Sequence, residues 1–102
     1  MDDVFQALAD PIRRELLDRL FARNGQTVSE LCVNIEISRQ AVSKHLSILE
    51  QANLVATVFR GREKYHYLNP VPIVDISNRW IGKFQRAQLE QLSDLKRLLE
   101  EE

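Results

Sequence analysis

Several residue types that mark familiar classes of protein are scarce or missing in this chain. Its 102 residues include one cysteine, Cys32, so no internal disulfide can form, and one thiol with two histidines is a small set for a metal cage. There are three glycines, and no nucleophile elbow or phosphate-binding glycine loop. We therefore expect no enzyme, no catalytic residue, no metal site and no cofactor.

Long hydrophobic runs are also absent. No apolar stretch approaches the roughly 20 residues that span a bilayer, and the start Met1-Asp2-Asp3 lacks the positive charge of a secretion signal. We expect a cytoplasmic protein without a membrane partner. What is present is an ordinary globular mixture, 44% hydrophobic and 28% charged, of a length that suits one domain over residues 1–102.

The net charge of −1 hides an uneven distribution along the chain. Residues 38–67 hold five basic and two acidic residues, whereas residues 1–37 hold four basic and seven acidic ones. A basic segment in a nearly neutral chain favours a local surface for a polyanion. A solvated basic face is the alternative, and charge alone does not separate the two.

Helix-start signals divide the first half of the chain. Asp10-Pro11 follows a short helical pattern and offers an N-cap, then proline at the first position of a second helix, expected over residues 11–23. Thr27 and Glu30 have the spacing of a capping box for a short third helix, and Ser38 is the expected N-cap of a fourth that ends near residue 52. The apolar faces expected on the second and third helices are Ile12, Leu16, Leu17, Leu20, Phe21, and Val28, Leu31, Cys32, Ile35.

The second half of the chain predicts a β-hairpin and one long helix. Residues 54–60 (LVATVFR) are rich in β-branched residues, residues 63–68 (EKYHYL) mix aromatic and polar ones, and Arg60-Gly61-Arg62 forms a basic tip. The prolines at 70 and 72 fit the first turn of a helix that continues over residues 70–102. The expected fold is mainly α with a small β-hairpin (α+β).

The third and fourth helices, separated only by residues 36–38, form a candidate helix-turn-helix whose second helix would enter the major groove. At about 100° per residue, Val42, Leu46 and Leu49 share one side of the fourth helix, and polar residues gather on the other. Glutamine and serine can read base edges, and arginine or lysine can contact bases or phosphate. An ordinary amphipathic helix with a polar outer face is the alternative. The basic hairpin downstream favours DNA, because its cations suit phosphates or the minor groove.

Five stretches of the sequence then match one family in the right order and cover most of residues 4–68. They are Ala7 to Leu20 (ALADPIRRELLDRL), Val28 to Val33 (VSELCV), Ser38 to Glu50 (SRQAVSKHLSILE), Ala52 to Val55 (ANLV) and Arg60 to Leu68 (RGREKYHYL). On these stretches the chain resembles the ArsR-type winged helix-turn-helix transcriptional regulators. The resemblance implies a winged helix, usually homodimeric, that represses transcription by binding operator DNA until an effector releases it.

The resemblance also assigns a DNA-binding surface. By motif position the recognition helix would begin at Ser38, with further contacts from that helix and from the hairpin, or wing. The expected DNA-binding residues are Ser38, Arg39, Gln40, Ser43, Lys44, His45, Arg60, Arg62 and Lys64. His45 lies at the edge of the apolar stripe, so it suits a phosphate contact and a packed boundary histidine equally well.

Three departures from the family pattern affect the expectation. Metal-sensing members carry Cys-Val-Cys in the third helix, where this chain has Cys32-Val33-Asn34, and the last helix, Ile73 to Glu102, has no histidine. We therefore expect no family-type metal site, and the effector is unknown. Asn53 replaces the usual glycine after the recognition helix, and asparagine tolerates the left-handed conformation.

Two other single residues allow more than one interpretation. Cys32 shares a helical face with apolar residues, which favours a small buried hydrophobe over a redox sensor. His66 alternates with Tyr65 and Tyr67 along a strand, and an exposed position is the favoured interpretation.

The last helix has an unusually wide apolar stripe, in which two strips lie about 100° apart. We expect one strip to pack on its own domain and the other on a second chain, near the first helix. Burial in its own core is the alternative, but a small winged helix has too little core to cover a helix of about 45 Å. The expected dimer-interface residues are Phe5, Leu8, Trp80, Ile81, Phe84, Leu92, Leu95 and Leu99.

Together the patterns predict a sequence-specific DNA-binding transcriptional regulator, a homodimeric repressor of a dyad-symmetric operator in double-stranded DNA. A winged helix that serves as a protein-protein interaction module is the alternative, since it needs the same core pattern but no basic wing.

Overall fold

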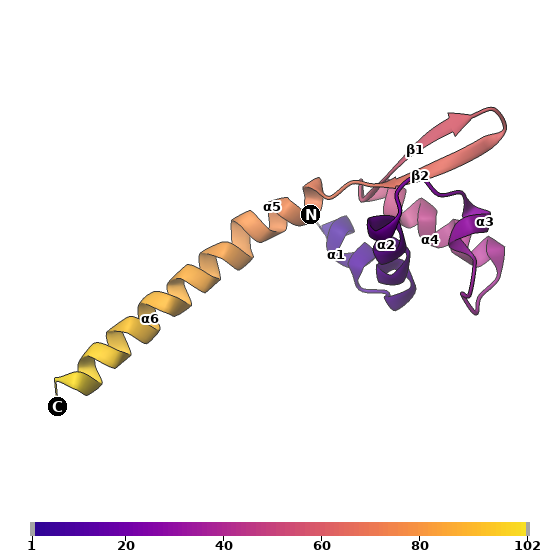
Figure 1. The fold of residues 1–102 in the computed structure, drawn as a ribbon. Helices are drawn as coiled ribbons and strands as arrows, with labels where there is room; N and C mark the ends of the chain where they lie inside the picture. Colours follow the sequence, from indigo (N-terminus) through magenta and orange to yellow (C-terminus); the bar gives the residue numbers. More distant parts are fainter. Residues whose placement is uncertain (1, 102) are drawn as a thin grey trace. The chain divides into compact units, whose positions relative to one another are not determined.

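The structure is a computed structural model that describes residues 2–101 in two units, one ending at Pro72 and one beginning at Ile73. The elements follow the predicted order: four helices, a two-stranded antiparallel sheet and a long C-terminal helical segment (Figure 1). The fold class, mainly α with a small β-hairpin, is thus confirmed. Within residues 2–101, no helix is long and apolar enough to cross a membrane.

The first two helices are α1, Asp2–Leu8, and α2, Pro11–Ala22. The Asp10 carboxylate caps α2 by accepting hydrogen bonds from the backbone N–H groups of Ile12 (2.8 Å) and Arg13 (3.2 Å). The proline that follows Asp10 occupies the first helical position, where the missing N–H costs no intrahelical bond. The helix boundary predicted at this dipeptide is confirmed.

The helix-turn-helix consists of α3, Val28–Leu31, and α4, Arg39–Gln51. Thr27 and Glu30 form the predicted capping box, in which each side chain accepts a hydrogen bond from the other residue's backbone N–H. The Ser38 hydroxyl caps α4 in the same manner, at 3.1 Å from a first-turn N–H. Local capping chemistry therefore sets where both helices begin.

A tight turn leads from α4 into the wing. Asn53 has a φ of 61°, the left-handed conformation expected where the family has glycine. The wing pairs β1, Val55–Arg60, with β2, Glu63–Leu68, in antiparallel register. Gly61 lies in the connecting turn with a φ of 64°, which favours glycine because it has no Cβ.

The core of the first unit lies where α2, α3, α4 and the base of the wing meet. It differs from the prediction at Phe21, which is 81% exposed because its position, about 100° around α2 from the fully buried Leu20, lies outside the face that packs. On the third helix only Leu31 is fully buried, since α3 ends there and Ile35 lies beyond it. The largest fully buried side chains are Leu16, Leu20, Leu31, Leu49, Leu54 and Val42.

His66 contradicts the prediction of an exposed strand position, because its side chain is only 2% exposed. Its Nδ1 lies 2.9 Å from the backbone oxygen of Gln26, and the two residues also form an isolated β-bridge. The segment before α3 thus covers this face of β2. The strand itself was predicted correctly. The segment at Gln26 covers His66, however, and so places this side chain in the interior.

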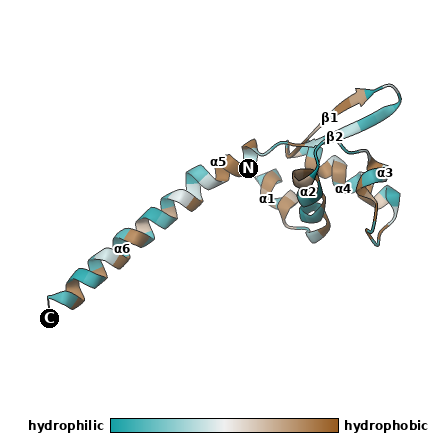
Figure 2. Cartoon of the chain, viewed as in Figure 1, coloured by the Kyte–Doolittle hydropathy of each residue, from teal (hydrophilic) through white to brown (hydrophobic). Residues whose placement is uncertain are grey.

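The C-terminal unit is helical but not uniform. It comprises most of α5, Val71–Ile76, then a π-helical turn, η1, over Ser77–Ile81, and α6, Gly82–Glu100. In the π-turn the N–H of Gly82 donates to the carbonyl of Ser77, five residues earlier. The long helical segment predicted over residues 70–102 is confirmed over residues 71–100, and residue 102 lies outside the described residues. The π-turn was not predicted. Figure 2 shows hydrophobic and hydrophilic segments alternating along α6.

Candidate nucleic-acid interface

The two sides of α4 differ as the sequence predicts. Val42, Leu46 and Leu49 are buried against the rest of the first unit. The opposite side is exposed and rich in hydrogen-bonding groups. The exposed residues at its beginning that were predicted to contact DNA are Ser38, Arg39, Gln40, Ser43 and Lys44. Their accessibility is what base or phosphate contact requires, and the contacts themselves remain a prediction.

His45 is half-buried and contacts α2. Its Nδ1 lies 3.2 Å from Nη1 of Arg13, whose guanidinium also donates to the backbone oxygens of Ala7 (2.8 Å) and Gln6 (3.0 Å) at the end of α1. Because a guanidinium only donates, Nδ1 of His45 is the acceptor in this contact. The contact fits the packed boundary histidine, and it links α4 to α1 and α2.

The three basic residues of the wing have different surroundings. Arg60 is exposed and lies over the Tyr65 ring, 5.7 Å from its centroid. Arg62 is exposed beside the turn, and no hydrogen bond or ion pair joins it to any residue from 2 to 101. Lys64 is half-buried, and its Nζ lies 3.1 Å from Oε2 of Glu50. Local sequence patterns do not single out Glu50, because a partner 14 residues away in the chain leaves no local signal.

A cleft lies between the beginning of α4 and the wing. It has a volume of about 270 Å³ and is lined by the beginnings of α3 and α4 and by the wing turn. Arg39 and Arg62 both line it, and neither forms a salt bridge within the described part of the chain. Glu63 also lines the cleft and accepts a hydrogen bond from Tyr65 Oη at 2.9 Å. Two arginines outside any of these salt bridges, at one cleft, suit an anionic group such as a backbone phosphate.

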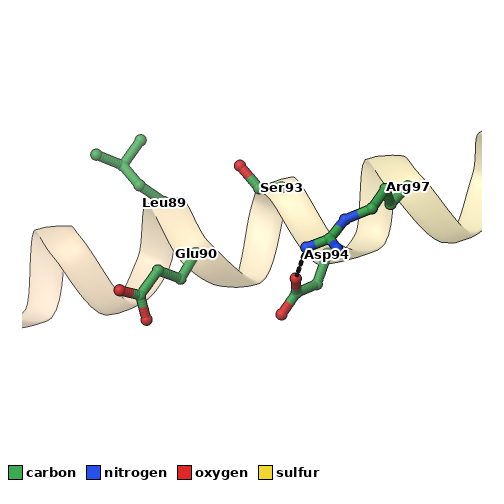
Figure 3. A pocket seen from close by; sticks show the side chains of 5 residues that line it. All are labelled: Leu89, Glu90, Ser93, Asp94 and Arg97. Atoms are coloured by element: carbon green, nitrogen blue, oxygen red, sulfur yellow. Dashed lines mark hydrogen bonds and ion pairs between the residues drawn. The ribbon is translucent and has the colours of Figure 1, made fainter.

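A second concave surface lies along α6 alone. Figure 3 shows its lining residues, Leu89, Glu90, Ser93, Asp94 and Arg97, along α6, with Arg97 bonded to Asp94 at 2.7 Å. An exposed ion pair three residues apart on one helix is an ordinary solvated feature. This surface does not enclose a ligand site, because a single helix forms all of it.

The predicted dimer residues of the C-terminal unit are all solvent-accessible in the single chain. Their side chains are between 50% and 64% exposed, although side chains of this kind are usually buried. On α1, Phe5 is 39% exposed and Leu8 is half-buried. The exposed large apolar residues of the last helical segment are Val71, Ile73, Val74, Trp80, Ile81, Phe84, Leu89, Leu92, Leu95, Leu98 and Leu99.

The possible metal ligands are dispersed. Cys32 has a free, half-buried thiol, so it is less covered than the sequence predicted. In the range 2–101, no group of three or more histidine, cysteine, aspartate or glutamate side chains is arranged to hold a metal ion. Neither Cys32 nor His66 therefore belongs to a ligand cluster among the described residues.

A helix-turn-helix with an exposed polar second helix, followed by a basic hairpin, defines a winged helix-turn-helix protein. A family model described as a helix-turn-helix domain matches residues 8–58. The HTH-type transcriptional regulator YuzN of Bacillus subtilis (strain 168) is 38% identical over 86 residues, covering 78% of this chain and 94% of that protein. The transcriptional repressor SdpR of the same organism is 34% identical, covering 82% of this chain and 91% of that protein.

Solved structures show the same likeness. An ArsR-like transcriptional regulator from Rhodococcus sp. RHA1 matches with a TM-score of 0.77 at 31% identity, covering 99% of this chain and 91% of that one. The ArsR family transcriptional regulator RHA00566 matches with a TM-score of 0.74 at 32% identity, covering 85% of this chain and 88% of that one. The chain belongs to the ArsR family of winged helix-turn-helix transcriptional regulators.

Proposed function

We propose that this regulator is a homodimeric repressor that binds a dyad-symmetric operator sequence-specifically. In this proposal α4 lies in the major groove and the wing contacts the DNA backbone. The main supporting observation is the cleft that Arg39 of α4 and Arg62 of the wing both line, next to the exposed polar side of α4. Gln40 and Ser43 would read base edges, while the arginines neutralise phosphates. The relative SdpR is a transcriptional repressor, and we extend repression to this chain.

The proposed dimer rests on the C-terminal helical segment and α1. Trp80 and Phe84 are 50% and 62% exposed, and a row of leucines continues along α6. An exposed apolar row of this length marks an interaction surface. The same row on a second copy of the chain can pack against it in a twofold-symmetric dimer. Twofold symmetry then requires a dyad-symmetric operator with half-site centres about 10 to 10.5 bp apart, or a multiple of that.

We also propose that the regulator works without a family-type metal site. Cys32, the C-cap residue of α3, is the one thiol, and position 34 is an asparagine with a φ of 61°. A thiophilic metal needs several thiolate or imidazole ligands at about 2.0 to 2.3 Å, and Cys32 belongs to no group of three or more possible ligands among residues 2–101. The signal that releases the operator would therefore act through a different group.

The base-reading role of α4 predicts a selective loss in Gln40→Ala. Removing the amide should weaken operator binding by about 1 to 3 kcal/mol per half-site while sparing binding to a scrambled duplex, because only base contacts distinguish sequences. Fluorescence anisotropy with both duplexes measures the difference. Gln51→Ala is the matched control, since Gln51 is exposed at the other end of the same helix. Equal losses of Gln40→Ala on both duplexes would refute the base-reading role.

A further inference from the structure

Glu50, in the last turn of α4, contacts both strands of the wing. Its Oε1 accepts a hydrogen bond from the Thr57 hydroxyl of β1 at 3.0 Å. Its Oε2 accepts one from the ammonium of Lys64 of β2 at 3.1 Å. A single carboxylate of the recognition helix therefore holds each strand of the hairpin by a separate oxygen.

The register of the hairpin explains how one side chain reaches both strands. Thr57 pairs with His66, and the next residue of β1 on that face, Phe59, pairs with Lys64. Thr57 and Lys64 are therefore diagonal neighbours on the face of the wing toward the first unit's core, where His66 is buried. A two-stranded hairpin is marginal alone, so its direction depends on such anchors. Glu50 is the anchor nearer the tip, and the bonds between Gln26 and His66 lie nearer the base.

The pair also changes the charge that the wing presents. The hydrogen bond from Lys64 is the largest influence that lowers the pKa of Glu50 below its ordinary value of 4.5, so the carboxylate is ionised at neutral pH. The ammonium of Lys64 is half-buried beside this carboxylate, and it lies 5.9 Å from the centroid of the Phe59 ring. The pair is neutral as a unit. Arg62, in contrast, is exposed and has no charged partner among residues 2–101.

We propose that Glu50 is a positioning residue of the DNA-binding surface, which fixes the wing at one angle to the recognition helix through Thr57 and Lys64. Lys64 then acts as the partner of Glu50 rather than as a phosphate contact. The inference rests on the proposed DNA-binding function and replaces the role that the sequence suggested for Lys64. The wing cations left to neutralise phosphate are then the exposed Arg60 and Arg62.

The first test compares two matched substitutions, Lys64→Met and Arg62→Met, in anisotropy titrations of the operator over a salt series. Arg62→Met should reduce the slope of log K against log salt by roughly 1 per contact, or about 2 in a dimer. Lys64→Met should leave the slope at the wild-type value and weaken operator binding by roughly two- to five-fold per half-site. A slope that falls in Lys64→Met as much as in Arg62→Met would overturn the inference.

The second test uses Glu50→Ala, for which charge and positioning predict opposite results. Removing an anion near DNA should tighten binding to every duplex if Glu50 acts only through its charge. If Glu50 positions the wing, the ratio of operator to scrambled affinity should fall by roughly two- to five-fold. Amide hydrogen exchange over residues 57–64 should accelerate by a similar factor, with the core amides unchanged. Glu15→Ala is the control, because it removes an ion pair of the same 3.1 Å length, between Glu15 and Arg19 on α2. It should change neither the affinity ratio nor the amide exchange of the wing.

The outcomes separate this inference from the function on which it rests. If the wild-type protein does not distinguish operator from scrambled DNA, the proposed function fails. If it does distinguish them, and Glu50→Ala tightens binding with an unchanged affinity ratio and unchanged exchange in the wing, the positioning role alone is refuted.

Discussion

Leu95→Asp is expected to leave the protein monomeric and to weaken operator binding by at least about 100-fold, or roughly 2.7 kcal/mol. Leu95 lies within the apolar row of α6 and is 53% exposed in the single chain. If two copies cover this row, the substitution buries an unpaired carboxylate in an apolar interface, at a cost of several kcal/mol. A monomer then binds each half-site independently, and it loses the affinity that a dimer gains by binding both half-sites at once.

Ser93→Asp is the matched control for this prediction. Ser93 lies two residues before Leu95 and therefore about 160° away from it around the helix, and it lines the polar surface drawn in Figure 3. The same new charge there should preserve the dimer and operator binding. Sedimentation equilibrium and anisotropy measure the two effects. A wild-type monomer at high micromolar concentration, or a Leu95→Asp variant that remains dimeric, would contradict the proposed interface.

Leu20→Ala is expected to lower the free energy of unfolding by about 2 to 5 kcal/mol. Leu20 is fully buried on α2, which contacts both α4 and β2, so truncating it leaves a cavity under the recognition helix and the wing. Phe21→Ala, at the next position, removes a larger apolar side chain that is 81% exposed, and it should cost less than about 1 kcal/mol. Urea unfolding followed by circular dichroism compares them. An equal loss of unfolding free energy in the two variants would contradict the described packing, in which Leu20 and not Phe21 is buried.

The element boundaries could be predicted because they depend on nearest neighbours in the sequence. Asp10, Thr27 and Ser38 each accept a hydrogen bond from a backbone N–H within three residues, and those bonds form in the structure. The left-handed turn at Asn53 follows from the same local chemistry. The polar side of α4 could be predicted too, because helical periodicity separates it from Val42, Leu46 and Leu49.

Properties that depend on tertiary neighbours could not be predicted from these patterns. Periodicity assigned Phe21 to the apolar face of α2, but the face that packs is narrower than the apolar pattern. Alternation along β2 could not show that the segment at Gln26 covers His66. The salt bridge from Lys64 joins residues 14 positions apart, and a list of basic wing residues cannot show that one of them is already paired.

The measurement that tests the central claim most directly is selection of DNA by the purified full chain. The protein is mixed with a random duplex pool, bound fragments are sequenced over several rounds, and the enriched site is titrated against its scrambled version across a salt series. We predict an inverted repeat with half-site centres about 10 to 10.5 bp apart, or a multiple of that, bound at least about 1,000-fold more tightly than the scrambled duplex. Recovery of no enriched sequence, with equal affinity for every duplex, would contradict sequence-specific recognition by α4.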